Sequence, residues 1–301
     1  MQKFRVTIVA ALIAFSMAAP AGAQEADALK KIKATGVINM GVRDGSLPFS
    51  YNDHMRLPIG YSIDLCMRVI DSIKISQDLP KLDVKMRLVN PAIRIPLVAN
   101  GTVDIECGST TNTIERQQQV AFLPTTFVAS TRFAFKKTSN IRSIDDLKGK
   151  TVTAATGTTN LRQITEINTQ RGLRMTIVPS KTTADGFAML EKGDVVALAS
   201  DDILLYGMIS NAGKPADFAV TDEPLSVEPY GIMIRKDDPA FKQVAGDAIR
   251  ALFKSGEIET IYAKWFIAPI APKNTSLNAP MSAALKRAIA KPTDSGNPTD
   301  Y

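Results

Sequence analysis

Residues 104–122 read DIECGSTTNTIERQQQVAF, and the order of side chains in this stretch is the strongest sign of the fold. A short apolar strand over Val103–Cys107 runs into glycine and hydroxyl positions that include Ser109 and Thr111, and Arg116 follows them. In open α/β sheets, ligands bind beyond the carboxyl ends of the strands. The stretch therefore predicts a strand end that presents hydroxyls, backbone N–H groups and an arginine to a ligand.

The residues after the hydroxyl positions indicate the charge of that ligand. Asn112 and Glu115 have the spacing of a capping box, which predicts that a helix begins at about Thr113. Free N–H groups and the helix dipole favour an anion at such a point. Arg116 can then pair with a carboxylate through two parallel hydrogen bonds. An ordinary capped helix with its arginine in solvent is the alternative interpretation of this stretch taken alone.

Strands and helices alternate along most of the chain. Apolar runs or alternating patterns predict strands over 37–42, 82–88, 103–107, 132–136, 151–155, 175–179 and 195–200. Helical periodicity predicts helices over 26–34, 63–73, 93–100, 184–192, 203–210, 239–255 and 281–290. This alternation indicates an α/β fold with largely parallel sheets.

Two further junctions between a strand and a helix carry polar groups. The first contains Gly157, which lets the backbone approach a ligand closely, and the hydroxyls of Thr158 and Thr159. The second ends in Asp201, which can accept from an ammonium group. A carboxylate pocket with one acid is the minimum needed to hold an α-amino acid. Asp201 can equally be read as the N-cap of the helix that follows it.

The composition excludes several classes of function. His54 is the only histidine, so no zinc cluster of the usual kind can be assembled and a histidine-based triad would depend on one loop residue. Cys66 and Cys107 are the only cysteines; a disulfide and two buried thiols remain equally open. Lysine and arginine total 36 against 30 acids, without a dense basic tract, which argues against a nucleic-acid partner.

The two ends of the chain differ from the middle. Residues 1–23 carry two cations, a short apolar run and the small residues Ala21 to Ala23, which predicts a secretory signal peptide cleaved after Ala23. At the other end, residues 276–301 are polar and rich in proline. We expect one helix in this C-terminal tail and disorder in its last residues.

A resemblance to a known family covers the chain from about Leu29 to Asn274. It rests on the ordered motifs VINMGVRDGSLPFSY, IGYSIDL, RIPLVANGTVDIECGSTTNTIERQQQVAF, SIDDLKGKTVTAATGTT, YGIMIRKDDPAFK and IYAKWF. Together they resemble the family 3 extracellular solute-binding proteins, which are the amino-acid receptors of ABC importers. Within the family, the segment from RIPL through ECGSTTN to ERQ is most similar to the receptors for glutamate and aspartate.

The resemblance implies a two-lobed periplasmic-binding-protein fold with a ligand cleft between the lobes. Lobe one would comprise residues 28–127 plus 230–275, and lobe two residues 131–226. Two hinge strands would lie near Val128–Ser130 and Val227–Tyr230. The protein would then be a periplasmic monomer without a cofactor or metal, which delivers its ligand to an ABC permease and the ATPase of that permease.

The family also implies roles for residues at the three junctions. Arg116 would bind the α-carboxylate of the ligand, assisted by Thr111 and Thr159. Asp201 and groups around Ser109 would bind the α-ammonium. These roles agree with the anion site and the acid that the junctions themselves indicate.

Two arginines outside the junctions bear on side-chain selectivity. Arg43 and Arg94 match positions that, in the receptors for glutamate and aspartate, favour a second carboxylate on the ligand. Pro91 and Thr183 depart from that pattern, because those receptors carry a serine and a histidine there. Glutamine or asparagine is therefore the alternative ligand. An enzyme of the dehydratase type and a sensor subunit are the alternative functions on the same fold.

Overall fold

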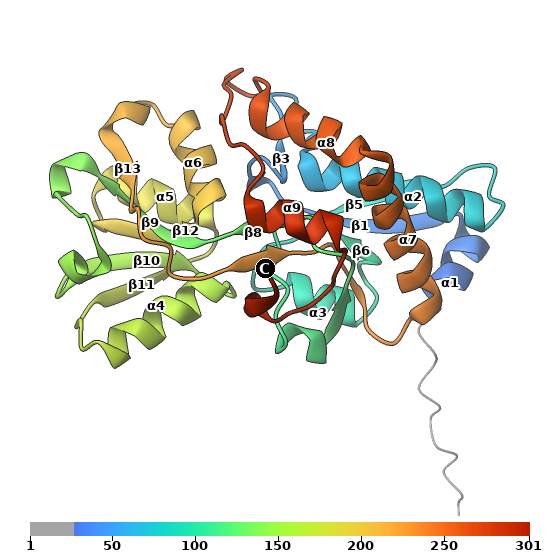
Figure 1. Ribbon diagram of the computed structural model, residues 1–301, viewed down its shortest axis with the longest axis horizontal. Coiled ribbons are helices and arrows are strands. Elements are labelled where there is room, and N and C mark those ends of the chain that lie inside the picture. The colour runs from blue at the N-terminus through green and yellow to red at the C-terminus, as the bar shows by residue number, and fades with distance from the viewer. Residues whose placement is uncertain (1–26) are drawn as a thin grey trace, which may run out of the picture.

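The computed structural model describes residues 27–301, so the predicted signal peptide lies outside the described residues. The chain forms two lobes, each built on a five-stranded sheet with helices packed against it (Figure 1). The sheet of lobe one has the order β5 (Asp83–Leu88), β1 (Val37–Val42), β6 (Ile105–Glu106), β15 (Met233–Arg235), β7 (Val120–Phe122). The sheet of lobe two has the order β11 (Thr176–Ser180), β10 (Thr151–Ala155), β12 (Ala197–Asp201), β9 (Thr131–Lys136), β13 (Phe218–Val220). The predicted two-lobed α/β fold is confirmed.

The sheets are mixed rather than largely parallel, which corrects the expectation from the alternating pattern. In lobe one, β1 pairs in parallel with β5 and β6, whereas β15 is antiparallel to both β6 and β7. In lobe two, β10 pairs in parallel with β11 and β12, whereas β9 is antiparallel to β12 and β13. The strands β9 and β15 are those that enter a lobe directly from the connection between the lobes. Their direction is therefore set by the path of the chain.

Two short strands connect the lobes. They are β8 (Phe127–Ala129) and β14 (Glu228–Tyr230), which pair with each other in antiparallel fashion. They lie between the two large sheets in Figure 1. Their positions overlap the two hinge strands that the family resemblance implies.

The helices cover the faces of the sheets. In lobe one they are α1 (Ala28–Thr35), α2 (Tyr61–Ser76), α3 (Arg94–Ala99), α7 (Pro239–Ser255) and α8 (Glu257–Tyr262). In lobe two they are α4 (Thr159–Gln170), α5 (Thr183–Lys192) and α6 (Asp202–Asn211). A three-stranded sheet of β2 (Gly45–Ser46), β3 (Ser50–Asn52) and β4 (Pro58–Ile59) follows β1. Across residues 27–301, no helix has both the length and the apolar character to cross a membrane.

An aromatic cluster anchors the connecting strands to lobe one. The ring of Phe127 on β8 stacks on that of Phe266 with centroids 5.0 Å apart, and Phe49 meets Tyr230 of β14 edge to face at 5.1 Å. Such aromatic pairs add about 0.5–1.5 kcal/mol beyond their buried area. Both connecting strands are therefore built into the core of lobe one.

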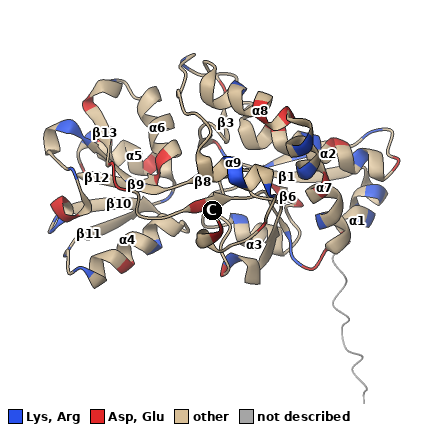
Figure 2. Cartoon of the chain, viewed as in Figure 1, with Lys and Arg blue, Asp and Glu red and all other residues tan. Residues whose placement is uncertain are grey.

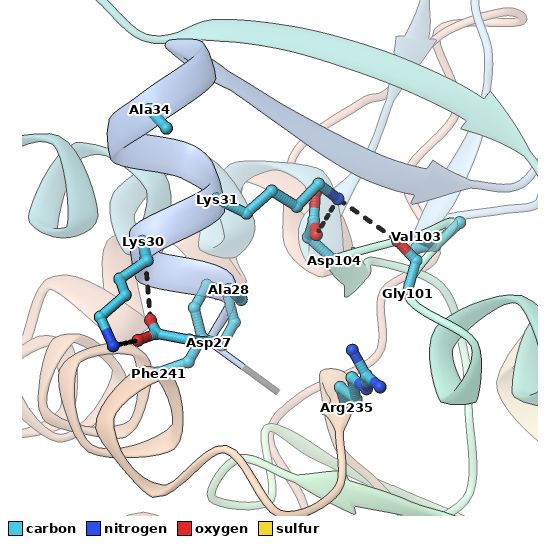
Figure 3. Close-up of a pocket in the computed structure, with 10 residues that line it drawn as sticks. All are labelled: Asp27, Ala28, Lys30, Lys31, Ala34, Gly101, Val103, Asp104, Arg235 and Phe241. Carbon is cyan, nitrogen blue, oxygen red and sulfur yellow. Dashed lines mark hydrogen bonds and ion pairs between the residues drawn. The ribbon is translucent and has the colours of Figure 1, made fainter. Parts of the chain in front are cut away.

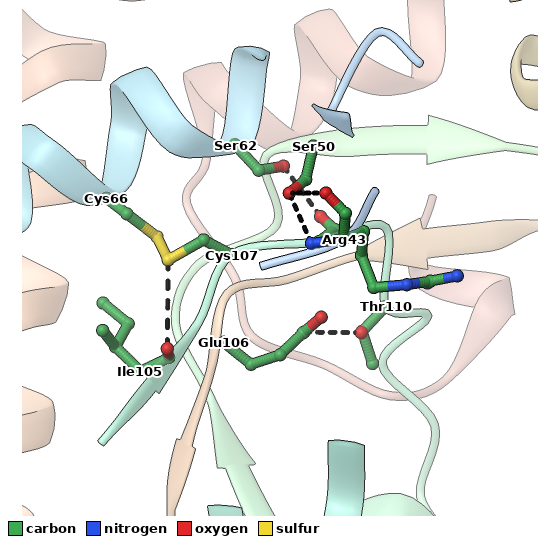
Figure 4. The surroundings of a disulfide bond; sticks show 9 residues. Arg43, Ser50, Ser62, Cys66, Ile105, Glu106, Cys107 and Thr110 are labelled. Atoms are coloured by element: carbon green, nitrogen blue, oxygen red, sulfur yellow. Dashed lines mark hydrogen bonds between the residues drawn. A yellow bond between two sulfur atoms is a disulfide. The ribbon is translucent and has the colours of Figure 1, made fainter. Parts of the chain in front are cut away.

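A disulfide joins Cys66 of α2 to Cys107, directly after β6 (Figure 4). Both cysteines are fully buried. The structure thus answers the question that the sequence left open. Because Cys107 precedes the hydroxyl-rich residues 108–111, the disulfide attaches that loop to α2.

The capping-box prediction at Asn112 is wrong, because no α-helix begins at Thr113. A single 3₁₀ turn, Arg116–Gln118, follows instead. The side chain of Asn112 accepts from Gln117 Nε2 at 2.8 Å and donates to the carbonyl oxygen of Asp294 at 2.8 Å. It therefore joins this loop to the C-terminal tail rather than capping a helix.

The C-terminal tail, residues 276–301, also differs from the expectation of partial disorder. It forms the helix α9 (Ala283–Ala290) and then runs back over lobe one. The backbone N–H of Thr125 donates to Thr293 O at 2.8 Å, and the hydroxyls of Thr125 and Tyr301 lie 2.7 Å apart. A polar, proline-rich composition predicts disorder, but here polar groups of lobe one are the partners that order the segment.

We expect deletion of residues 292–301 to lower the free energy of unfolding by about 2 kcal/mol, because it removes several of these hydrogen bonds at a net ~1 kcal/mol each. The milder variant Tyr301→Phe removes only the hydroxyl shared with Thr125 and should lower it by about half as much. Urea denaturation followed by circular dichroism would measure both. An unchanged midpoint for the deletion would show that the tail does not stabilise lobe one.

Candidate functional site

A small cavity of about 10 Å³ lies between the two lobes. Lobe one lines it with Arg43, Pro91, Arg94, Ser109 and Thr111. Lobe two lines it with Thr158, Thr159, Asn160, Thr183, Ser200, Asp201 and Leu204. Seven of the eight residues predicted from the sequence are therefore brought together, although they come from opposite halves of the chain. The eighth, Arg116, contacts the residues that flank the cavity.

Two buried arginines line the cavity from lobe one. Arg43 follows β1 and is 4% exposed, and Arg94, the first residue of α3, is 3% exposed. Arg94 Nη1 donates to Thr110 Oγ1 at 2.6 Å and to the carbonyl oxygen of Ser109 at 3.2 Å. The Nε atom of each arginine has no hydrogen-bond partner, and neither arginine forms a salt bridge within the described part of the chain. These donors are available to an anion.

The pKa values of the two arginines show the effect of burying their charges close together. Burial, together with the like charge of Arg94, lowers the pKa of Arg43 to about 10. Burial likewise lowers the pKa of Arg94. Both guanidinium groups remain charged at neutral pH, so two cations lie close together with little water around them. An added carboxylate would relieve their repulsion.

Arg116 joins the two lobes. Its Nη1 donates to the carbonyl oxygen of Thr111 in lobe one at 2.7 Å, and its Nη2 donates to that of Gly157 in lobe two at 3.1 Å. Burial lowers the pKa of Arg116 to about 9, and the charge of Arg94 adds to the effect. The sequence placed Arg116 in the site but did not predict these backbone contacts.

The loop that carries Ser109 and Thr111 is held on both sides by backbone hydrogen bonds. Gly231 N donates to the carbonyl oxygen of Thr110 at 3.1 Å, and Asn112 N donates to that of Pro229 at 2.7 Å. From α2, Ser62 Oγ donates to the carbonyl oxygen of Gly108 at 2.7 Å. A connecting strand and the helix bound by the disulfide thus fix the loop in place.

The hydroxyls of lobe two have internal partners. Thr158 Oγ1 accepts from Leu161 N at 3.2 Å and so caps α4, while also donating to Ala155 O at 2.6 Å. Thr159 Oγ1 donates at 2.8 Å to Oε2 of Glu228, a buried acid on β14. Both threonines line the cavity, but their side-chain protons are already used.

Asp201 lines the cavity from lobe two and is buried, and its negative charge acts on the pKa of Arg94. Its Oδ1 accepts from Asn160 Nδ2 at 2.8 Å, and its Oδ2 accepts from the hydroxyl of Tyr230. It makes no capping bond to α6. The neighbouring Asp202 instead accepts from Ser130 N at 3.2 Å and Ile203 N at 2.8 Å. Asp201 thus occupies the N-cap position of α6, as the alternative interpretation expects, but its side chain does not cap the helix.

Burial, together with the negative charge of Glu228, raises the pKa of Asp201 to about 7. Its bonds from Tyr230 and Asn160 act in the opposite direction without overcoming the loss of hydration. A ligand ammonium group at this point would favour the ionised form.

Sequence reasoning missed three residues that hold this part of the site. Asn160 was assigned no role, and Glu228 and Tyr230 were included only in the range of an implied hinge strand. No local pattern marks them, because Tyr230 and Glu228 lie 29 and 69 residues away from Asp201 and Thr159 along the chain. Their position in a connecting strand was the available signal, since such a strand must pass beside the cavity.

Gly157 allows a close approach of the backbone, but its neighbour in the structure is the backbone of lobe one. Its φ is +80°, and a Cβ there would lie 2.7 Å from the carbonyl oxygen of Pro91 in the other lobe. Gly207 of α6 makes a similar approach, since its Cβ would lie 2.7 Å from the carbonyl oxygen of Leu47. The lobes therefore come together to backbone contact at both points, which a larger side chain would prevent.

A larger hollow lies elsewhere on lobe one, beside α1 and the loop at Gly101 (Figure 3). Four of its charged side chains form two pairs, Lys31 with Asp104 and Lys30 with Asp27, each at 2.7 Å. The charges over both lobes are likewise mixed (Figure 2). Residues 27–301 hold no cluster of histidine, cysteine and acids suited to a metal ion. The cavity between the lobes is therefore the candidate site.

Asp201 should make stability depend on pH. An acid whose pKa is about 7 when folded, against an ordinary 3.8, binds more protons in the folded state. Its stabilising effect is complete below about pH 4 and is lost as the pH rises towards 7. We expect the free energy of unfolding of the ligand-free protein, relative to Asp201→Asn, to fall by on the order of 2 kcal/mol between pH 5 and pH 8. Denaturant titrations at both pH values measure it; equal differences at both would contradict it.

The chain is similar to known proteins in sequence and in structure. The chain is 49% identical over 286 residues to the L-glutamate/L-aspartate-binding protein of Pseudomonas aeruginosa, covering 94% of this chain and 95% of that protein. It is 41% identical to the glutamate/aspartate import solute-binding protein of Escherichia coli, covering 92% and 91%. An ancestral arginine-binding protein bound to arginine superposes with a TM-score of 0.70 at 25% identity, covering 77% and 98%. Residues 38–268 match the family model. The chain belongs to the bacterial extracellular solute-binding proteins, family 3.

Proposed function

We propose that this protein is a periplasmic receptor that captures glutamate or aspartate and delivers it to the permease of an ABC importer. The observation that carries the proposal is the charge pattern of the cavity. Arg43 and Arg94 line it from lobe one without an ion-pair partner, and Asp201 lines it from lobe two. The names of the relatives at 49% and 41% identity support the same ligands.

The cavity suggests how such a ligand is held. A guanidinium has five N–H donors, and the two backbone bonds of Arg116 leave donors for the α-carboxylate. Thr111 and Thr159 flank that position. Asp201, with groups around Ser109, receives the α-ammonium. The arginine pair is then left for the side-chain carboxylate.

Pro91 and Thr183 bear on the strength of that last contact. Both line the cavity, at positions where the glutamate and aspartate receptors of the resemblance carry a serine and a histidine. Fewer polar contacts weaken the hold on a distal carboxylate, so glutamine and asparagine are the ligands to test against it. The charge of the arginine pair still favours the acids, since an amide cannot offset a buried cation.

Capture is proposed to work by closure of the lobes. The ligand contacts residues of both lobes, and the contacts with lobe two form only when the cavity closes. It therefore binds the closed arrangement better than the open one and shifts the population towards it. The strands β8 and β14 absorb the movement. In this scheme the closed monomer is recognised by a permease that works with its ATPase, and the ligand leaves chemically unchanged.

Titration calorimetry with glutamate, aspartate, glutamine and asparagine tests the proposed ligands. We expect the acids to bind with a Kd of about 1 μM, roughly −8 kcal/mol, and more tightly than both amides. Tighter binding of an amide would contradict the role of Arg43 and Arg94. Mass spectrometry of the ligand before and after incubation checks the alternative of an enzyme, because turnover would change its mass or composition.

Arg116→Ala should abolish binding of all four ligands, because it removes the contact to the α-carboxylate that they share. The loss of a buried charge-assisted contact costs roughly 2–5 kcal/mol. The matched control is Arg68→Ala, whose guanidinium pairs with Glu257 on the surface of lobe one at 2.7 Å. The same calorimetry should show the affinity of wild type in that control. An Arg116 variant within threefold of wild type would exclude the proposed contact.

A further inference from the structure

Glu106 is a buried carboxylate that lies beneath the site without lining it. It ends β6 in lobe one and is 0% exposed. Its Oε2 accepts from Thr110 Oγ1 at 2.6 Å, whereas its Oε1 has no hydrogen-bond partner (Figure 4). An isolated buried carboxylate is strongly unfavourable unless opposite charges offset it. The charges that offset Glu106 are therefore expected close by.

The hydroxyl of Thr110 links Glu106 to the arginine pair. It gives its single proton to Glu106 and accepts from Arg94 Nη1 at 2.6 Å. The chain of contacts runs from a carboxylate through a hydroxyl to a guanidinium. Each contact involves a charged group and is stronger than a neutral hydrogen bond. The orientation of the Thr110 hydroxyl, and with it the position of Arg94, follows from Glu106.

Glu106 also lies beside Arg43. A Cβ on Gly108 would lie 2.3 Å from Glu106 Oε1 and 3.1 Å from Arg43 Cγ. The carboxylate and the arginine thus flank the same glycine, and only a residue without a side chain leaves room for both. Burial lowers the pKa of both Arg43 and Arg94, and the negative charge of Glu106 acts in the opposite direction on each. Glu106 therefore interacts with both members of the pair.

The charges of Glu106, Arg43 and Arg94 can be summed as one group. Among these three groups, two guanidinium ions and one carboxylate sum to a single positive charge, while the carboxylates of Asp44 and Asp201 act on Arg43 and Arg94 from outside the group. A ligand side chain with one negative charge brings the sum to zero. An uncharged side chain leaves one positive charge uncompensated, and a doubly charged one leaves a negative excess. Uncompensated buried charge is unfavourable in both cases.

We propose that Glu106 is a positioning and selectivity residue, which holds Arg94 through Thr110 and cancels one arginine charge so that the pocket favours side chains with one negative charge. This inference rests on the proposed function, because it assumes that Arg43 and Arg94 face the side chain of the ligand. Glu106 itself does not contact the ligand.

The test uses Glu106→Gln, which keeps the shape of the side chain and removes its charge. Calorimetry at pH 8 with glutamine, glutamate and phosphoserine compares side chains with zero, one and two negative charges. We expect the ratio of the Kd for glutamine to that for glutamate to rise about tenfold over wild type. The ratio of the Kd for glutamate to that for phosphoserine should rise as well. Comparing ratios between variants cancels differences in ligand size.

Thr110→Val is the second variant and should shift the first ratio in the opposite direction. It keeps the charge of Glu106 but removes the hydroxyl that holds Arg94, so the preference for glutamate over glutamine should fall at least about threefold. The matched control is Asp104→Asn, which removes a buried carboxylate two residues earlier that pairs with Lys31. Its ratios should equal those of wild type.

The outcomes separate this inference from the proposed function. The ratio in wild type tests whether the receptor prefers acidic ligands at all, whereas the change of the ratio in the variants tests Glu106. Equal weakening of all three ligands in Glu106→Gln would reduce Glu106 to a structural residue and overturn the inference. If that variant does not fold, an unchanged ratio in Thr110→Val would overturn it instead.

Discussion

Burial of like charges between two lobes is the constraint on which the rest of this structure depends. Arg43, Arg94 and Arg116 all lie at the lobe interface, and none of them forms a salt bridge within residues 27–301. Each has lost hydration, and the pKa of each is lowered by burial. The opposite charges come from three buried carboxylates that surround the cavity: Asp201, Glu106 and Glu228. The site therefore holds fixed charges of both signs, and the charges of a bound ligand would add to them.

The fold holds these charged groups near one another, but the arginines and the carboxylates do not form direct ion pairs. Thr110 stands between Glu106 and Arg94, and Thr159 contacts Glu228. Hydroxyl side chains of this kind fix the orientation of the charged groups that they contact. They leave guanidinium N–H donors free to bind a ligand. The connecting strands supply part of the arrangement, because β14 carries Glu228 and its end pairs with the loop at residues 110–112. Movement of the lobes and geometry of the site are therefore coupled through the same short segment.

Particular residues show how far local patterns predict such a site. The junctions at Ser109, Thr159 and Asp201 were recognised because a strand end followed by polar residues is a local pattern. The capping box at Asn112 has an equally good local pattern, yet its side chain binds Asp294, 182 residues away. The expectation of largely parallel sheets is wrong for a related reason, since the direction of β9 and β15 depends on how the chain passes between the lobes. A local pattern indicates which conformations and contacts a segment is able to form. Residues far away in the sequence then determine which of them it forms.

The sequence by itself determined the alternation of strands and helices, the chemical character of the strand ends, and the family. These depend on periodicity and on ordered motifs, which are properties of neighbouring residues. Only the tertiary structure decided that Cys66 and Cys107 are joined across 41 residues and that the C-terminal tail packs on lobe one. It alone placed Glu106 beneath the arginine pair. Contacts between distant residues leave no trace in local patterns, because they depend on which residues the folded chain brings together.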